Sequence, residues 1–171
     1  VIYQINISSL FNQPNSIQTV IIDHDVANMM GVHEDDLYLA ALTNGNRDAY
    51  VANLKEFVGL GEEVYDPLEN DLFIITNKDY RYGAFSICCS QVLSLVAERI
   101  SGDFIILPGS IHGMYAATIY PGVDINYFTS AANDVSHMNE SDEDFLTENI
   151  YIYRVKENVI DSVSGGWRWH L

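Results

Sequence analysis

Basic residues are scarce in this sequence, which has 8 lysines and arginines against 24 aspartates and glutamates and a formal net charge of −16. The acidic excess is spread along the chain rather than gathered in a tail. Such a surface repels phosphate backbones, and nucleic-acid binding normally needs a basic footprint. We therefore expect no DNA or RNA ligand, and the charge points either to a basic partner or simply to solubility.

Cysteine is rarer still. Cys88 and Cys89 are the two cysteines, and they are adjacent. Neighbouring cysteines rarely bond to each other, and this pair lacks the two-residue spacer of redox motifs. We expect a reducing cytoplasm, in which both side chains behave as small hydrophobic groups.

Long hydrophobic runs are also missing. Runs such as residues 104–107 are far too short to span a bilayer, and no charged-then-apolar leader is visible. We therefore expect no membrane segment and a cytoplasmic protein. Because the chain begins with valine rather than methionine, a longer native chain, of which this is the C-terminal part, stays open.

The central segment, Asp71–Tyr120, holds the densest apolar sequence in the chain. Its pattern predicts strands over 71–76 and 82–88, a helix over 91–100 capped by Ser90, and strands over 104–107 and 114–120. Strands in hairpins with helices between them indicate an α+β fold with a mostly antiparallel sheet and helices on one face. Doubly wound α/β is the alternative, but only residues 82–107 alternate as that fold requires. At 171 residues the chain suits a single globular domain over 1–171.

The flanking sequence predicts further elements. Residues 1–22 form a hairpin, Asp23 caps a helix that Gly31 ends, and residues 59–70 form a linker. The other expected elements are helices over 34–43 (stopped by Asn44-Gly45-Asn46), 50–58 and 124–137 and a strand over 149–155 that pairs with 159–163.

Several blocks of the sequence resemble a family. They are Met30-Gly31-Val32, Asp36-Leu37-Tyr38 with Ala40-Ala41-Leu42, Ile75-Thr76-Asn77 with Tyr82-Gly83-Ala84, Ile106-Leu107-Pro108-Gly109-Ser110-Ile111-His112, and Tyr151 with Tyr153. In these blocks the chain resembles the uncharacterised bacterial family catalogued as domain of unknown function 5688. The resemblance covers about residues 17–155. Members usually have a second serine where Gly109 stands and an acid where Gly113 stands. The resemblance implies a domain extent and a bacterial cytoplasmic setting, and no established activity.

Ser110 and His112 are the strongest candidates for catalysis, with Asn77 as a polar neighbour. Residues two apart on a strand share a face, so both side chains could enter one cleft. A serine nucleophile needs a base within hydrogen-bond reach, and a spacing of about 6–7 Å between the two Cα atoms makes direct contact awkward. There is no Gly-x-Ser-x-Gly elbow. The simpler interpretation is a turn between strands, with Ser110 and His112 hydrogen-bonding its backbone.

Metal and cofactor sites are not predicted. The histidines are His24, His33, His112, His137 and His170, and Asp23-His24-Asp25 places three potential ligands together. Zinc sites need three or four convergent ligands, and no pair here has a metalloenzyme motif. Residues 142–144 lack the ligand pattern of a calcium loop, and no glycine-rich phosphate loop is present.

Two functions therefore compete. The first is a non-enzymatic intracellular interaction or regulatory module that recognises another protein through a sheet edge or an aromatic surface. Trp167, Trp169, Tyr151 and Tyr153 could form such a surface, or could equally close the edge of the core. The alternative is a hydrolase-like enzyme that uses Ser110 and His112.

Overall fold

The computed structural model describes residues 2–8, 18–58, 72–122, 124–130, 144–163 and 168–171. The chain divides into two compact units, Val1–Asn44 and Gly45–Leu171. The single domain expected from the chain length stays a prediction. The proposed linker at 59–70 and the residues Trp167 and His137 lie outside the described part of the chain.

The N-terminal unit is a hairpin followed by helices. Strands β1 (Tyr3–Asn6) and β2 (Thr19–Ile22) pair antiparallel, as the alternating sequence predicted. Helix α1 (His24–Met30) begins after Asp23, whose Oδ1 accepts a hydrogen bond from the Val26 N–H at 2.9 Å, and ends at Gly31. Helix α2 (Glu34–Asp48) has three acidic residues in its first turn, where they favour the positive end of the helix dipole.

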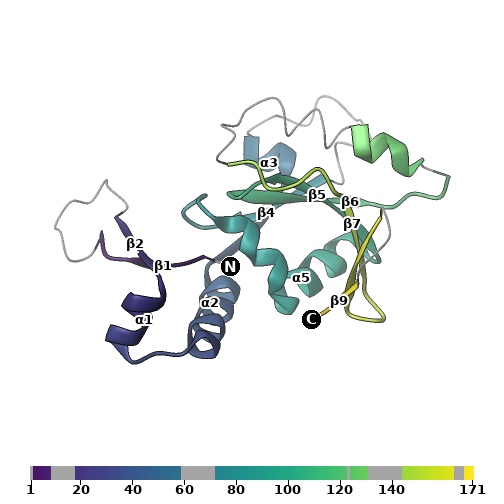
Figure 1. Cartoon of the computed structure of the whole chain (residues 1–171). Coiled ribbons are helices and arrows are strands. Elements are labelled where there is room, and N and C mark those ends of the chain that lie inside the picture. The colour runs from purple at the N-terminus through teal and green to yellow at the C-terminus, as the bar shows by residue number, and fades with distance from the viewer. Residues whose placement is uncertain (1, 9–17, 59–71, 123, 131–143, 164–167) are drawn as a thin grey trace. The chain divides into compact units, whose positions relative to one another are not determined.

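The second unit is built on one sheet of seven strands with the order β3-β4-β6-β5-β7-β8-β9, in which every neighbouring pair is antiparallel (Figure 1). The strands are β3 (Ala49–Asn53), β4 (Leu72–Asn77), β5 (Phe104–Ser110), β6 (Gly113–Thr118), β7 (Tyr151–Arg154), β8 (Val159–Ser162) and β9 (Arg168–His170). This sheet together with the helices confirms the predicted α+β class rather than doubly wound α/β.

Both faces of the sheet are covered. Phe104 and Tyr153 are opposite one another on β5 and β7, with ring centroids 5.2 Å apart, on the face covered by α5 (Ser90–Ile100). The other face carries Ile105, which packs in one cluster with Phe128 from the helical residues 125–130. In Figure 1 that helical segment and α5 lie on opposite sides of β5 and β6. The sequence predicted helices on one face of the sheet. That prediction is wrong, because helical residues pack on both faces.

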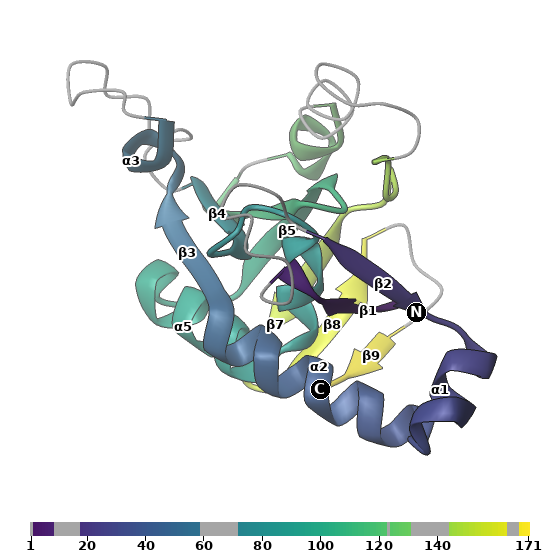
Figure 2. The same ribbon diagram turned by 90° about the vertical axis from the view of Figure 1, so that its left-hand side faces the viewer.

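Two predicted elements between residues 34 and 58 are wrong in detail. Helix α2 does not stop at Asn44 but runs through Gly45, which lies against the side chains of Phe85 and Cys89. The predicted helix over 50–58 is strand β3 followed by a short helix, α3 (Leu54–Val58), because β3 pairs with β4 along its full length. Figure 2 shows β3 continuing directly from α2 and into α3.

Two further predictions fail in the central segment. Residues Gly83–Cys88 form a 3-10 helix, η2, instead of a strand, because the chain turns sharply at Tyr82, whose φ is 56°. Helix α5 starts after Cys89, and Ser90 is its first residue rather than its cap. The strand predictions over 71–76, 104–107, 114–120, 149–155 and 159–163 are confirmed by β4, β5, β6, β7 and β8.

Candidate functional site

The turn between β5 and β6 places His112 between two other segments. Its Nδ1 accepts a hydrogen bond from the Tyr82 backbone N–H at 3.0 Å, and its Nε2 lies 3.3 Å from Asp144 Oδ1. The imidazole and the Tyr82 ring are 5.3 Å apart between centroids. Since a neutral imidazole has one donor and one acceptor nitrogen, these contacts fit the tautomer with its proton on Nε2, directed at the carboxylate.

Backbone contacts join the same three segments. The His112 carbonyl accepts hydrogen bonds from Thr76 Oγ1 at 2.7 Å and from the Gly83 N–H at 3.2 Å. The Ile111 N–H donates to the Asp144 carbonyl at 3.0 Å. A Cβ on Gly83 would clash with Thr76 Oγ1 and lie 2.8 Å from the His112 carbonyl oxygen, so this approach requires glycine. The end of β4, the β5–β6 turn and residue 144 therefore form one hydrogen-bonded assembly.

Asn77 organises the loop that leads from β4 to η2. Its Oδ1 accepts hydrogen bonds from the N–H groups of Asp79 and Arg81 at 3.1 and 3.2 Å, and its Nδ2 donates to the Arg81 carbonyl at 2.6 Å. Tyr80 and Tyr82 both have left-handed backbone, with φ of 54° and 56°. Their side chains remain largely outside, at 51% and 44% exposure. The loop is thus held by a side chain while it presents two tyrosines.

The Tyr80 ring belongs to an aromatic cluster at this end of the sheet. Its centroid lies 5.8 Å from Tyr50 in an edge-to-face arrangement and 5.4 Å from Phe57. Tyr50 comes from β3 and Phe57 from α3. Aromatic pairs in this geometry are worth about 0.5–1.5 kcal/mol beyond the area that they bury. The cluster therefore fixes the ring of Tyr80 as well as its backbone.

Ser110 is buried, at 5% exposure, and its Oγ accepts a hydrogen bond from the His112 backbone N–H at 3.0 Å. The Ser110 hydroxyl thus accepts a backbone hydrogen bond within the turn between β5 and β6. Both ring nitrogens of His112 have partners of their own, Tyr82 and Asp144. The structure brings all three sequence candidates, Asn77, Ser110 and His112, into one region. Tyr82, Gly83 and Asp144 also belong to this region, and the sequence does not predict their membership because no periodicity links segments so far apart in the chain.

The two cysteines are thiols that are at least partly removed from solvent. Cys88 is half-buried, Cys89 is buried, and neither forms a disulfide. Burial, with a smaller contribution from the neighbouring Cys89, raises the pKa of Cys88 to about 12, and burial also raises the pKa of Cys89. Since the thiolate is the reactive form, both residues are poor nucleophiles and metal ligands at neutral pH. Across the residues that the structure describes, no three His, Cys, Asp or Glu side chains converge as ligands of a metal ion.

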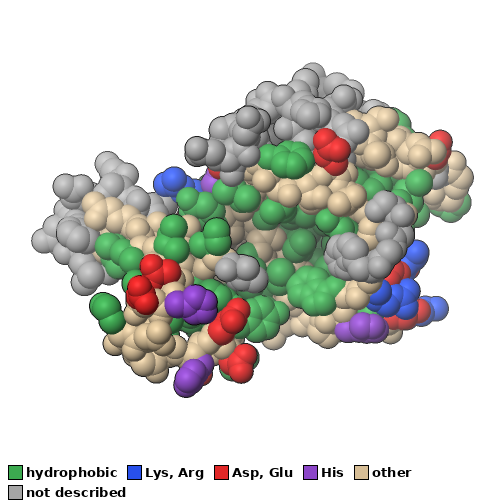
Figure 3. Space-filling view, viewed as in Figure 1, with side chains coloured by type: hydrophobic (Ala, Val, Ile, Leu, Met, Phe, Trp, Pro, Cys, Tyr) green, Lys and Arg blue, Asp and Glu red, His purple; other side chains and the backbone are tan. Residues whose placement is uncertain are grey.

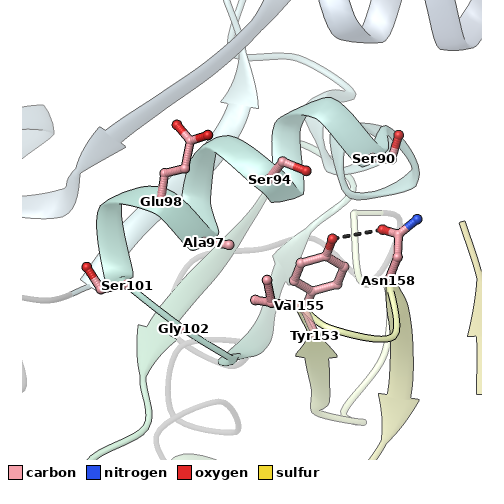
Figure 4. Close-up of a pocket in the computed structure, with 9 residues that line it drawn as sticks. All are labelled: Ser90, Ser94, Ala97, Glu98, Ser101, Gly102, Tyr153, Val155 and Asn158. Atoms are coloured by element: carbon pink, nitrogen blue, oxygen red, sulfur yellow. Dashed lines mark hydrogen bonds between the residues drawn. The ribbon is translucent and has the colours of Figure 1, made fainter.

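A shallow groove of about 550 Å³ lies between α5 and the β7–β8 hairpin (Figure 4). Ser90, Ser94 and Glu98 line it from the helix, and Tyr153 and Asn158 from the hairpin. The Tyr153 hydroxyl donates to Asn158 Oδ1 at 2.8 Å, drawn as the dashed line in Figure 4. The serine side chains that line the groove are typical of a polar helix surface. The Tyr153 side chain is buried and belongs to the core.

The fold and this assembly define an α+β protein whose antiparallel sheet carries a hydrogen-bonded loop and turn at one end. The chain belongs to the family described as Family of unknown function (DUF5688), whose model matches residues 1–155. Searches of curated proteins and of solved structures find no match. Within the described part of the chain, none of the helices has both the length and the apolar character needed to cross a bilayer.

Proposed function

We propose that this chain is a non-enzymatic interaction or regulatory module of the bacterial cytoplasm that contacts another protein through its Asn77–Tyr82 loop. Two exposed tyrosines in strained backbone support this function. Left-handed backbone at a bulky residue costs on the order of 1–3 kcal/mol, and such strain gathers where a protein uses it. Tyr80 and Tyr82 both have it, and Asn77 and His112 hold the loop in place.

The chemistry of the loop suits protein recognition. Tyrosine and arginine are enriched among the residues that dominate binding energy, and this loop carries Tyr80, Arg81 and Tyr82 in succession. Because the loop is already ordered by Asn77, binding does not have to order it, which favours affinity. The net charge of −16 disfavours nucleic acid as the ligand, and two adjacent cysteines outside any disulfide suit a reducing compartment.

Quantitative affinity capture from the host lysate, with the whole chain as bait, tests this function. The bait variants are Tyr80→Ala/Tyr82→Ala and, as a matched control, Tyr127→Ala, because Tyr127 is also 51% exposed but lies outside the loop. We expect a reproducible protein partner that the wild type and the control retain and that the double variant loses by about tenfold or more. A partner set unchanged by the double variant would contradict the proposal.

A hydrolase-like activity is the second candidate, favoured by the carboxylate of Asp144 beside the imidazole of His112. Proton transfer from Ser110 to the ring would require the Tyr82 N–H to leave Nδ1, since Nε2 is directed at Asp144. Assays with activated esters, comparing the wild type with Ser110→Ala, decide the matter. We expect no turnover above that of the variant; turnover that Ser110→Ala abolishes would establish the enzyme instead.

A further inference from the structure

Within the described residues of the N-terminal unit, several hydrophobic side chains are exposed. Neither α1 nor the whole of α2 contains a buried residue, and among the residues that the structure describes the β1–β2 sheet has two strands. A two-stranded sheet is marginally stable in water without something packed on it. Exposed hydrophobic residues occur on β2, α1 and α2 and directly before β1: Ile2 at 74%, Val20 at 39%, Ile21 at 58%, Met29 at 85%, Met30 at 48% and Leu39 at 61%.

The charge of this unit has one sign. Residues 1–44 contain no lysine or arginine, and their acidic residues are Asp23, Asp25, Glu34, Asp35 and Asp36. Asp23 caps α1 through Val26, and Asp36 Oδ2 accepts a hydrogen bond from the His33 N–H at 3.1 Å. Figure 3 shows acidic and hydrophobic side chains side by side over α1 and α2. The apolar surface is therefore bordered by carboxylates that no lysine or arginine of the same unit neutralises.

The first turn of α2 also acts on the hairpin. The pKa of Tyr3, on β1, is raised by burial first, and then by the negative charges of Glu34 and Asp35. The field of these carboxylates thus reaches β1, which pairs with the strand that carries Val20 and Ile21. A ligand for this surface gains when it brings hydrophobic and positively charged groups together.

We infer that the N-terminal unit binds a basic, amphipathic segment of a partner protein. The apolar face of the segment covers Ile21, Met29 and Leu39, and its lysines and arginines meet Asp25, Glu34 and Asp35. Methionine suits this role because its flexible thioether adapts to differently shaped apolar surfaces. A second copy of this chain is a poorer occupant, because it would bring the same carboxylates to the contact. This surface is distinct from the Asn77–Tyr82 loop, and either can fail without the other.

Binding of a synthetic peptide to the whole chain tests the inference. The probe is a labelled helical peptide of leucine and lysine, followed by fluorescence anisotropy at 50 and 150 mM salt, and its counterpart of leucine and glutamate is the control. We expect the basic peptide alone to bind, and more weakly at the higher salt. Met29→Ser should weaken binding about tenfold, whereas Leu95→Ser, at an exposed leucine of α5, should not change it.

Matched charge variants separate this surface from the general acidity of the chain. Asp25→Asn/Glu34→Gln/Asp35→Asn should weaken binding about tenfold, because it removes three charge contacts with the lysines of the peptide. The variant Glu98→Gln/Glu148→Gln/Glu157→Gln removes the same number of exposed carboxylates from the second unit and should leave binding unchanged. Circular dichroism checks that each variant is folded.

Three outcomes would overturn the inference. The first is an equal loss of binding with both triple variants, which would indicate attraction by net charge alone. The second is full binding by Met29→Ser. The third is a dimer in analytical ultracentrifugation that Met29→Ser dissolves, which would identify a second copy as the occupant.

Discussion

The Nδ1 atom of His112 accepts a hydrogen bond from the backbone N–H of Tyr82 at 3.0 Å, across 30 residues of sequence. This contact secures a tyrosine whose φ is 56°, and the same imidazole reaches Asp144 through Nε2. A side chain that the sequence offers as a catalytic base thus acts, in this geometry, as a link between three segments.

Replacing His112 with alanine should lower the free energy of unfolding by about 1–3 kcal/mol, since it removes the acceptor for Tyr82 and the partner of Asp144. His112→Asn should recover part of this loss, because its side-chain oxygen can occupy the position of Nδ1. Urea unfolding of the two variants measures the difference. Equal stability of the asparagine and alanine variants would show that the Tyr82 contact contributes little.

Asn77→Ala should release the loop, since three hydrogen bonds from one side chain hold it. We expect a loss of about 1–3 kcal/mol and faster hydrogen exchange at the amides of Asp79 and Arg81. Asn77→Asp keeps the acceptor for those two amides and loses the donor to the Arg81 carbonyl. Its stability should therefore lie between those of the wild type and Asn77→Ala. Unchanged exchange at both amides in the alanine variant would contradict this role.

Gly45→Ala should destabilise the protein although it lies within α2, where alanine alone is favoured over glycine by about 1 kcal/mol. The new methyl would lie 2.7 Å from the Sγ of Cys89, which is buried between η2 and α5, so α2 or the Cys89 side chain must shift. Gly102→Ala is the control, because its added Cβ meets nothing within 4 Å. The melting temperatures of the two variants decide the outcome, and a stabilised Gly45→Ala would show that the contact is soft.

Stability should fall in acid partly through Asp161. Hydrogen bonds from Arg168, at 2.6 and 2.9 Å, with help from Arg154, hold the pKa of Asp161 below its ordinary value of 3.8. Because the folded pKa is the lower one, the contribution is complete above the unfolded pKa and is lost as the pH falls through the folded pKa. Asp161→Asn should therefore lower the urea midpoint at pH 7, with a difference from wild type that shrinks below about pH 4.

The same series with Glu148→Gln, which replaces an exposed carboxylate elsewhere, should show no such convergence. A constant difference between Asp161→Asn and wild type from pH 7 to pH 3 would mean that the carboxylate charge is not what joins β8 to its neighbours.

Local chemistry was readable from the sequence where it was self-contained. Asp23 and Gly31 bracket α1 as predicted, because a cap and a left-handed glycine act within a few residues. Gly45 marked a helix end in the sequence, yet α2 continues because packing against Cys89 outweighs the propensity of one residue. The 3-10 helix η2 was read as a strand, since its apolar composition fits both and the turn at Tyr82 depends on distant contacts.

The candidate site followed the same division. Ser110 and His112 were identifiable as a serine–histidine pair and Asn77 as a polar residue directly after a strand, and the structure brings them together. Their partners were not identifiable, because Asp144 and Gly83 meet His112 through the order β4-β6-β5 of the sheet rather than through spacing in the chain. The left-handed backbone of Tyr80 also has no signature in the sequence, since bulky residues rarely adopt it.

The family match ends at residue 155, and β8 begins at Val159. Yet Val159 and Ile160 are 0% and 1% exposed, and β8 occupies the flank of β7. A recombinant fragment trimmed to the family boundary would therefore expose the free edge of β7 together with the apolar surface that β8 shields. Unprotected edges of that kind invite pairing between molecules, so expression of this domain calls for the full C-terminal extension.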